Sequence, residues 1–407
     1  MAITVKPDQW QRIEGGITAA KGFRAAGVHC GVKSDRHDLA LIVSDTLASA
    51  AAMFTTNAVK AAPVLVSQEK VQSGAAQAII VNSGNANACT GERGLADAWE
   101  MGQLAATTLG IAEEFVLVAS TGVIGIPLPM DAIRAGVRHL PAALDRDGAA
   151  AAEAILTTDA FPKTAAVQLQ VKGKRVTIGG IAKGAGMIHP NMATTLCFLT
   201  TDASVPAPVL RGALRSAIDQ SFNCISVDGD TSTNDTVFLL ANGAAGASPL
   251  LEDDDEFARF TSALTALTTD LARMVVRDGE GASKLVSITL RGARTPGDAR
   301  RAAQAVMTSP LVKTAIYGGE PNWGRVLAAV GRSGAAVASD LAEIWIGGVQ
   351  VVRHGAGIPD ELPAAAEAMK QPEYEIVVDL HLGEASFTGW TCDLNEGYVK
   401  INAGYMT

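Results

Sequence analysis

The fold and the chemistry are best predicted from one stretch, KGAGMIHPNMATTLCFLTTD, which spans residues 183–202. It begins with a Gly-rich turn around Lys183 and ends in the apolar run Leu196–Leu199, which has the length of a buried strand. Ala193-Thr194-Thr195 lies directly before this run. A threonine hydroxyl becomes a good nucleophile only beside a base. Because threonine is also common where strands begin, the chemical interpretation needs support from the rest of the chain.

Further strand patterns surround this segment. On its N-terminal side, Val167–Val171 and Val176–Ile178 flank Lys172-Gly173-Lys174, a spacing that predicts a β-hairpin. The same reasoning predicts a second hairpin over Ile344–Val352, with its turn at Gly347-Gly348. Other predicted strands are Leu39–Val43, Ala78–Val81, Phe115–Val118 and Tyr374–Leu382.

Helical spacing is clearest after residue 256. Six apolar side chains recur there at steps of three and four and share one face: Phe257, Phe260, Leu264, Leu267, Leu271 and Met274. Pro206–Ser221 and Pro296–Met307 also have helical patterns, each with a proline at its start. Gly243–Glu256 combines small residues, a proline and an acidic run, so we expect a linker there. The mixture predicts an α/β or α+β protein with mixed sheets.

Composition limits the classes of function. The 407 residues, 48% of them hydrophobic, suffice for two or three domain-sized units. A net charge of −9 argues against nucleic-acid binding. The five cysteines form no CxxC pair, so we expect no disulfide or zinc site and predict buried, reduced thiols. With no run of about 18 apolar residues and no signal-peptide pattern, we expect no membrane span and a cytoplasmic location.

Several catalytic motifs are absent from the sequence. Neither GxSxG nor HExxH occurs, and the six histidines do not cluster. Gly27–Ser34 superficially resembles a phosphate-binding loop but has the wrong spacing. The usual hydrolase triads, a metal site and nucleotide-binding loops are therefore disfavoured.

The segment around Thr194 resembles the self-cleavage segment of the ornithine acetyltransferase (ArgJ) family, whose pattern is close to KGSGMIxPNMATML. Here Ala185 replaces Ser and Thr195 replaces Met, and neither change removes the key threonine. Five further motifs match the family in order: Ser83–Gly91, Ser120–Gly125, Val227–Asp235, Gly318–Arg325 and Asn402–Thr407. The resemblance implies an α/β, mixed-sheet layered sandwich of the ArgJ/DmpA-like self-processing type.

The resemblance also implies a reaction. The chain is expected to cut itself between Ala193 and Thr194, giving an alpha chain of residues 1–193 and a beta chain of residues 194–407. The new α-amine of Thr194, with a reference pKa of about 8, then serves as the base for its own hydroxyl. The implied reaction moves an acetyl group from N2-acetylornithine to glutamate. It needs no cofactor or metal, has acetyl-CoA as a candidate second donor, and runs in an α2β2 assembly.

Individual roles follow from the matching positions. Thr121 and Gly122 correspond to the family's oxyanion hole, through a hydroxyl and a backbone N–H. Lys183, expected on a Gly-flanked turn, would pair with a substrate carboxylate, and Glu280 with the donor's side-chain ammonium. The remaining substrate-binding matches are Thr157, Thr194, Asn402 and Thr407, and we expect a strand at Tyr398–Ile401 to anchor the C-terminal tail.

Two other functions remain open from the sequence. The first is an N-terminal-nucleophile amidase or aminopeptidase, in which water replaces the acceptor amine. Such a hydrolase would release acetate at the same rate with or without glutamate. The second is a non-enzymatic scaffold rich in Gly and Ala, which would stay as one full-length band on a denaturing gel.

Overall fold

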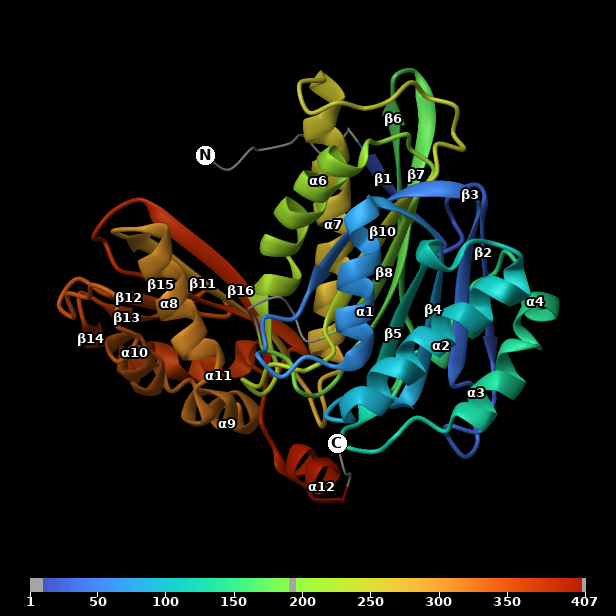
Figure 1. The fold of residues 1–407 in the computed structure, drawn as a ribbon. Coiled ribbons are helices and arrows are strands. Elements are labelled where there is room, and N and C mark those ends of the chain that lie inside the picture. The colour runs from blue at the N-terminus through green and yellow to red at the C-terminus, as the bar shows by residue number, and fades with distance from the viewer. Residues whose placement is uncertain (1–9, 190–194, 405–407) are drawn as a thin grey trace.

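The computed structural model describes residues 10–189 and 195–404, and its strands form two mixed sheets (Figure 1). Among the described residues, the first sheet has nine strands in the order β1-β6-β7-β8-β10-β3-β4-β5, with β2 also paired to β3. The strands are β1 (Trp10–Ile13), β2 (Phe23–Val28), β3 (Leu39–Phe54), β4 (Ala75–Asn85), β5 (Val116–Val123), β6 (Lys163–Val171), β7 (Lys174–Lys183), β8 (Leu196–Thr201) and β10 (Thr236–Ala241).

The long strand β3 joins two halves of this sheet. Its first part pairs with β2 and β4, and its last part pairs with β10 after a register irregularity between Val43 and Ala48. One core combines side chains of both halves, including Ile42, Ile79 and Phe238. The two halves therefore enclose a shared apolar layer, as in the predicted layered sandwich.

Helices cover the outer faces of both halves. Helices α6 (Ala207–Asp219) and α7 (Asp255–Arg277) pack over β6–β8 and β10, while a second group covers β2–β5 (Figure 1). That group is α1 (Ala62–Lys70), α2 (Gly91–Leu109), α3 (Met130–Val137) and α4 (Leu140–Ala143). Short elements complete this part of the chain: α5 (Ala149–Ala154) and the 3-10 turns at Val71–Ser73, Glu113–Phe115 and Phe222–Cys224.

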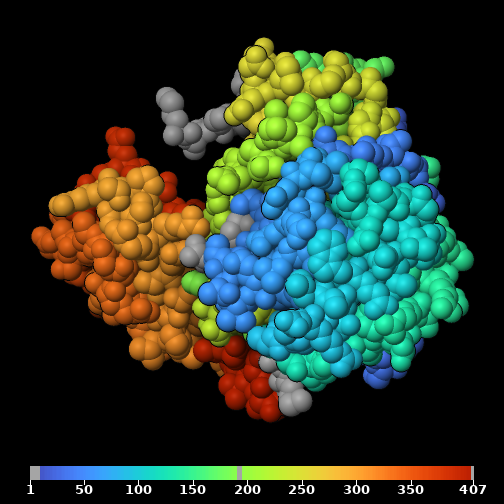
Figure 2. Space-filling view, viewed as in Figure 1, coloured from blue at the N-terminus to red at the C-terminus, as the bar shows by residue number. Residues whose placement is uncertain are grey.

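The second sheet and its helices form a separate lobe, and the part of this lobe from β11 onward is orange to red in Figure 2. In the described residues its order is β14-β13-β12-β15-β11-β16-β9. The strands are β9 (Ile225–Ser226), β11 (Leu285–Ala293), β12 (Glu343–Ile346), β13 (Val349–Arg353), β14 (Ala356–Gly357), β15 (Glu373–Asp379) and β16 (Ala385–Cys392). The helices that follow α7 are α8 (Pro296–Met307), α9 (Pro310–Gly318), α10 (Trp323–Gly331), α11 (Leu362–Ala368) and α12 (Glu396–Gly404), with a 3-10 turn at Pro359–Glu361.

Most sequence-predicted elements are confirmed. Both hairpins form, as β6–β7 and β12–β13. Their turn residues have positive φ, 50° and 71° at Lys172-Gly173 and 57° and 82° at Gly347-Gly348, which matches the backbone twist of tight hairpins. Helix α8 has the predicted bounds, and α7 buries the predicted apolar face around Leu264. The α/β class with mixed sheets is confirmed.

Two predictions that concern residues away from the candidate site are wrong. Gly243–Glu256 is not a linker between domains, because it joins β10 to α7, which packs on the same sheet, and buries Leu250 in their common core. The cysteines are not all buried either. Cys197, Cys224 and Cys392 are buried, but Cys30 is half-buried and Cys89 is exposed, and all five are free thiols.

The predicted cleavage point does not coincide with the boundary between the lobes. Strands β8 and β10 follow residue 194, yet they lie between β7 and β3, which precede it. The division into chains 1–193 and 194–407 stays a prediction. Within the two described ranges, no helix combines the length and apolarity that crossing a membrane requires.

Candidate active site

A cavity of about 260 Å³ opens where the ends of β5, β7 and β8 meet α12. Six sequence-predicted site residues line it: Thr121, Gly122, Thr157, Lys183, Glu280 and Asn402. The other three, Ala193, Thr194 and Thr407, lie outside the described residues. The structure therefore brings together every predicted site residue that it describes, while their individual roles stay predictions.

Thr121 and Gly122 lie near the end of β5. The parallel ladder with β4 sets Gly122 opposite Gly84. Gly122 has φ of 134°, and a Cβ on it would lie 2.3 Å from the Gly84 carbonyl carbon. A side chain there would be both strained and overlapping, so this position requires glycine. Asn234 braces the neighbouring chain, because its Nδ2 donates to the carbonyl oxygens of Ser120 and Ala86 at 2.8 and 2.7 Å.

Lys183 connects two other predicted site residues. Its Nζ donates to Thr157 Oγ1 at 2.8 Å and to Thr121 Oγ1 at 3.2 Å. The expected turn position is wrong, because Lys183 is the last residue of β7 and only 8% exposed. Burial lowers the pKa of Lys183, and the nearby Asp159 carboxylate opposes that effect. The ammonium is thus held at a fixed point of the cavity wall.

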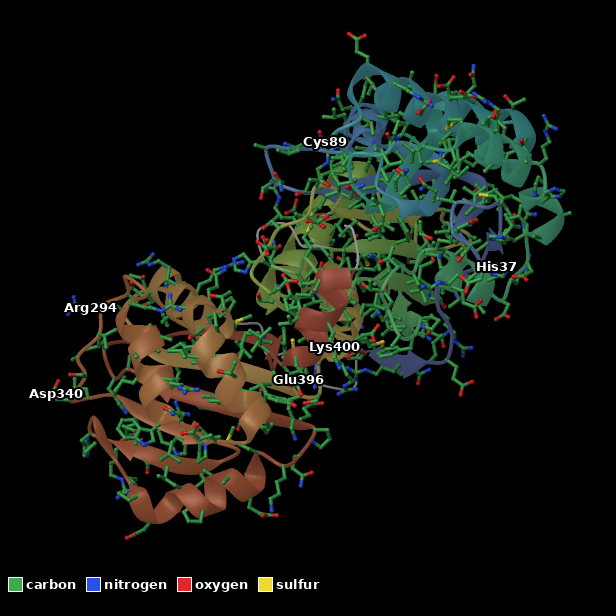
Figure 3. All side chains as sticks on the ribbon, turned by 90° about the horizontal axis from the view of Figure 1, so that it is seen from below. His37, Cys89, Arg294, Asp340, Glu396 and Lys400 are labelled. Atoms are coloured by element: carbon green, nitrogen blue, oxygen red, sulfur yellow. The ribbon has the colours of Figure 1, made fainter. Side chains whose placement is uncertain are left out.

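Glu280 and Asn402 contact each other across the cavity. Asn402 Nδ2 donates to Glu280 Oε2 at 2.7 Å. The strand predicted at Tyr398–Ile401 is wrong, since these residues belong to α12. Asn395 explains the helix, because its Oδ1 accepts from the Gly397 N–H at 2.8 Å and satisfies a free donor at the helix start. Figure 3 shows Glu396 and Lys400 of this helix at the junction of the two lobes.

Sequence reasoning missed a group of lining residues from the Val227–Asp235 motif, which was recognised as a family match but given no role. They are Asp228, Asp230, Ser232, Thr233, Asn234 and Asp235, and Tyr398 of α12 joins them. Asp228 accepts from the backbone N–H of Met187 at 2.6 Å and of Ile188 at 2.9 Å. It therefore fixes the loop that leads to residues 190–194. The density of Asp, Ser, Thr and Asn in the motif was the available signal.

Asp235 and Thr195 lie side by side where β8 and β10 begin, because the parallel register pairs Thr236 with Leu196. Asp235 is 3% exposed, and burial raises its pKa well above the usual range. Among the described residues, neither its Oδ2 nor the Thr195 hydroxyl has a hydrogen-bond partner. Both residues line the cavity, so two buried polar atoms without a described partner lie next to it.

The described lining combines one cation with several carboxyl groups. Lys183 supplies the positive charge, and Asp228, Asp230, Asp235 and Glu280 supply the acidic groups. A small molecule that carries both a carboxylate and an ammonium matches this arrangement, because each charge finds an opposite partner. The hydroxyl of Thr121 and the backbone of Gly122 add donors of the kind that stabilise a tetrahedral oxyanion. The site can thus bind an amino acid and assist acyl transfer.

Comparison with known proteins gives consistent matches. The model of the ArgJ family matches residues 24–407. The arginine biosynthesis bifunctional protein ArgJ of Symbiobacterium thermophilum is 52% identical over 399 residues, covering 97% of this chain and 99% of that protein. Its namesake from Geobacter sulfurreducens is 51% identical over 393 residues, covering 95% and 99% of the two chains.

Solved structures are similar as well. A chain of ArgJ from Bacillus halodurans is 52% identical with a TM-score of 0.44, and the match covers 45% of this chain and 97% of that one. A chain of ornithine acetyltransferase from Mycobacterium tuberculosis, complexed with ornithine, is 42% identical with a TM-score of 0.42, covering 45% and 98%.

Proposed function

Because the chain belongs to the ArgJ family, we propose that its cavity transfers an acetyl group from N2-acetylornithine to glutamate through an acetyl-Thr194 intermediate. Acetyltransferase activity and a role in arginine biosynthesis follow from the family and from relatives about as long as this chain. The resemblance seen in the sequence is thereby confirmed. Glutamate as acceptor and Thr194 as nucleophile are parts of the proposal.

One observation supports the proposal most strongly: the cavity wall presents a lysine ammonium and a glutamate carboxylate together with threonine hydroxyl groups. Lys183, held between Thr121 and Thr157, is suited to the α-carboxylate that both substrates carry. Glu280, held by Asn402, is suited to the side-chain ammonium of acetylornithine. These two contacts fix an amino acid by both of its charges and orient its acetylated amine.

The proposed chemistry has two acyl transfers. The Thr194 hydroxyl attacks the acetyl carbonyl carbon while the Thr194 α-amine takes its proton. The Thr121 hydroxyl and the Gly122 N–H stabilise the oxyanion, which collapses as ornithine leaves with the proton. The amine of glutamate then attacks the ester, and the same groups act in reverse. Acetylglutamate leaves and free Thr194 is restored.

Thr194 can supply an α-amine only after the Ala193–Thr194 bond is cut, so the proposal includes self-cleavage. Asp228 supports it indirectly, because it fixes the backbone of Met187 and Ile188 shortly before that bond. We further propose an α2β2 assembly in the cytoplasm, with no cofactor or metal and with acetyl-CoA as a candidate second donor. These points rest on the family resemblance.

The test combines mass and kinetics. Mass spectrometry of the purified protein should show two fragments, the second beginning at Thr194, whereas Thr194→Ala should stay intact and inactive. Double-reciprocal plots with acetylornithine and glutamate should be parallel, because one nucleophile serves two amines in turn. Efficient cleavage of Thr194→Ala would refute the assignment. Acetate release that is independent of glutamate would instead identify an amidase.

A further inference from the structure

A buried ion cluster lies behind Lys183 and outside the cavity lining. Lys163 Nζ donates to Asp159 Oδ1 at 2.6 Å and also contacts Asp278 Oδ2. The side chains of Lys163 and Asp159 are fully buried, and that of Asp278 is nearly so. Buried charges of this kind are rare unless they are paired. The predicted reaction uses none of the three.

Asp159 connects this cluster to the candidate site through two backbone bonds. Its Oδ2 accepts from the Thr157 N–H at 2.9 Å, and its Oδ1 accepts from the Gly184 N–H at 2.7 Å. Gly184 directly follows Lys183. One carboxylate therefore fixes both the loop that carries Thr157 and the strand end that carries Lys183. The side chains of these two residues then meet at 2.8 Å.

Asp159 also acts on the charge of Lys183. The groups that face Lys183 are the acidic Asp159, Asp235 and Glu280 and the basic Lys163 and Lys33. Burial lowers the pKa of Lys183, and Asp159 provides the largest opposing effect. Lys163 acts in the other direction, because it adds a second positive charge to the same region.

We propose that Asp159 is a positioning residue that holds Thr157 and Lys183 in the arrangement that receives the substrate carboxylate, and that Lys163 and Asp278 anchor Asp159 from the interior. The proposal rests on the proposed function, in which Lys183 binds that carboxylate. Asp159 itself touches no substrate. It determines where the Lys183 ammonium lies and up to what pH it stays charged.

The first test compares Asp159→Asn with Asp202→Asn in the full chain. An amide offers one acceptor oxygen where the carboxylate offers two, so either Thr157 or Gly184 loses its partner. We expect the KM for both amino-acid substrates to rise on the order of tenfold in Asp159→Asn, with a smaller change in kcat. Asp202 is the matched control, because it is also buried and accepts two backbone N–H bonds, from Thr177 and Lys21, beyond the far end of β8. Asp202→Asn should lower Tm and leave KM unchanged.

The second test uses the sign of a pH shift. In Asp159→Asn the KM should begin to rise at a lower pH than in the wild type, because Lys183 loses the charge that keeps it protonated. In Lys163→Met the KM should begin to rise at a higher pH, because a competing cation is gone. Because the substrates titrate identically in all variants, opposite shifts in the pH dependence of KM must come from groups of the enzyme. A purely structural cluster would give equal losses of Tm and no opposed shifts.

Three outcomes would overturn the proposal. They are a wild-type KM in Asp159→Asn, shifts of the same sign in both variants, and failure of both variants to fold while Asp202→Asn folds. The variant Lys183→Met shows whether the role of Asp159 or the proposed function itself is wrong. If Lys183→Met binds acetylornithine as the wild type does, the assignment of Lys183 is wrong. If Lys183→Met loses binding and Asp159→Asn does not, only the role of Asp159 is wrong.

Discussion

Replacing Gly186 by alanine should weaken binding of the donor without unfolding the protein. A Cβ on Gly186 would lie 2.5 Å from Glu280 Oε2 and 2.6 Å from its Cδ. Non-bonded carbon contacts are comfortable at about 3.5 Å, so the carboxylate must move by roughly 1 Å. Because it ends a flexible side chain, it can move without disturbing the core, and we expect a loss of stability below about 1 kcal/mol.

The displacement has a larger effect on binding. It breaks the 2.7 Å hydrogen bond from Asn402 to Glu280 and moves the carboxylate away from the donor's ammonium. Hydrogen bonds to charged groups contribute about 1.5–3 kcal/mol. Since about 1.4 kcal/mol corresponds to a factor of ten, the KM for acetylornithine should rise roughly 10- to 100-fold. Glutamate has no side-chain ammonium, so its KM should change much less.

Initial rates of acetyl transfer, measured while each substrate is varied, give the two KM values. Gly212→Ala is the matched control, because a Cβ at this position in α6 meets nothing within 4 Å. Alanine in that helix should raise stability by about 0.5–1 kcal/mol and leave both KM values unchanged. A wild-type KM for acetylornithine in Gly186→Ala, or an equal rise for both substrates, would refute the role of Glu280.

Three further variants test other parts of the site. Thr121→Val should lower kcat by about 100-fold and change KM little, because the lost hydrogen bond forms mainly in the transition state; an unchanged kcat would make Thr121 structural. Burial raises the pKa of Asp235 above its unfolded value, so stability is lost as pH rises above about 4. The Tm of Asp235→Asn relative to wild type should therefore increase between about pH 4 and pH 8, whereas a constant difference would contradict this. Deleting Met406-Thr407 should leave cleavage intact and raise both KM values several-fold, each contact contributing about 1 kcal/mol; wild-type kinetics would remove the tail from the site.

Sequence patterns correctly predicted the helices and hairpins that are determined by residues within or next to them. The turn at Lys172-Gly173 and the proline at the start of α8 act within a few residues, and both elements form as predicted. The prediction of a strand in the C-terminal tail was wrong because it, too, used only a few neighbouring residues. The composition of Tyr398–Ile401 predicted a strand, but the Asn395 side chain caps a helix there. The capping residue Asn395 precedes Tyr398–Ile401 by three positions and so has no effect on the composition of those four residues.

The site residues were predicted from their match to family motifs, and no physical argument from the sequence placed them together. Nothing in the spacing of Thr121, Thr157 and Lys183 reveals that their side chains meet, because strand order in the sheet decides it. Asp159 was missed for a related reason. Its partners include Gly184 and Lys163, and Lys163 in turn pairs with Asp278, more than a hundred positions away in the sequence. Long-range pairing of this kind leaves no periodic signal.

The position of β8 has a consequence for the two fragments. β8 lies in the middle of the first sheet, paired along its whole length with β7 on one side and β10 on the other. β10 in turn pairs with β3, so strands from beyond residue 194 are inserted between strands from before it. Once cut, the two fragments would still share one continuous sheet, in which their strands are hydrogen-bonded to each other. Dilution should not readily separate the folded fragments, but unfolding releases two chains, so their Tm should fall as the protein concentration falls. Neither fragment made alone contains the complete first sheet, so activity should be recovered only when both are synthesised together.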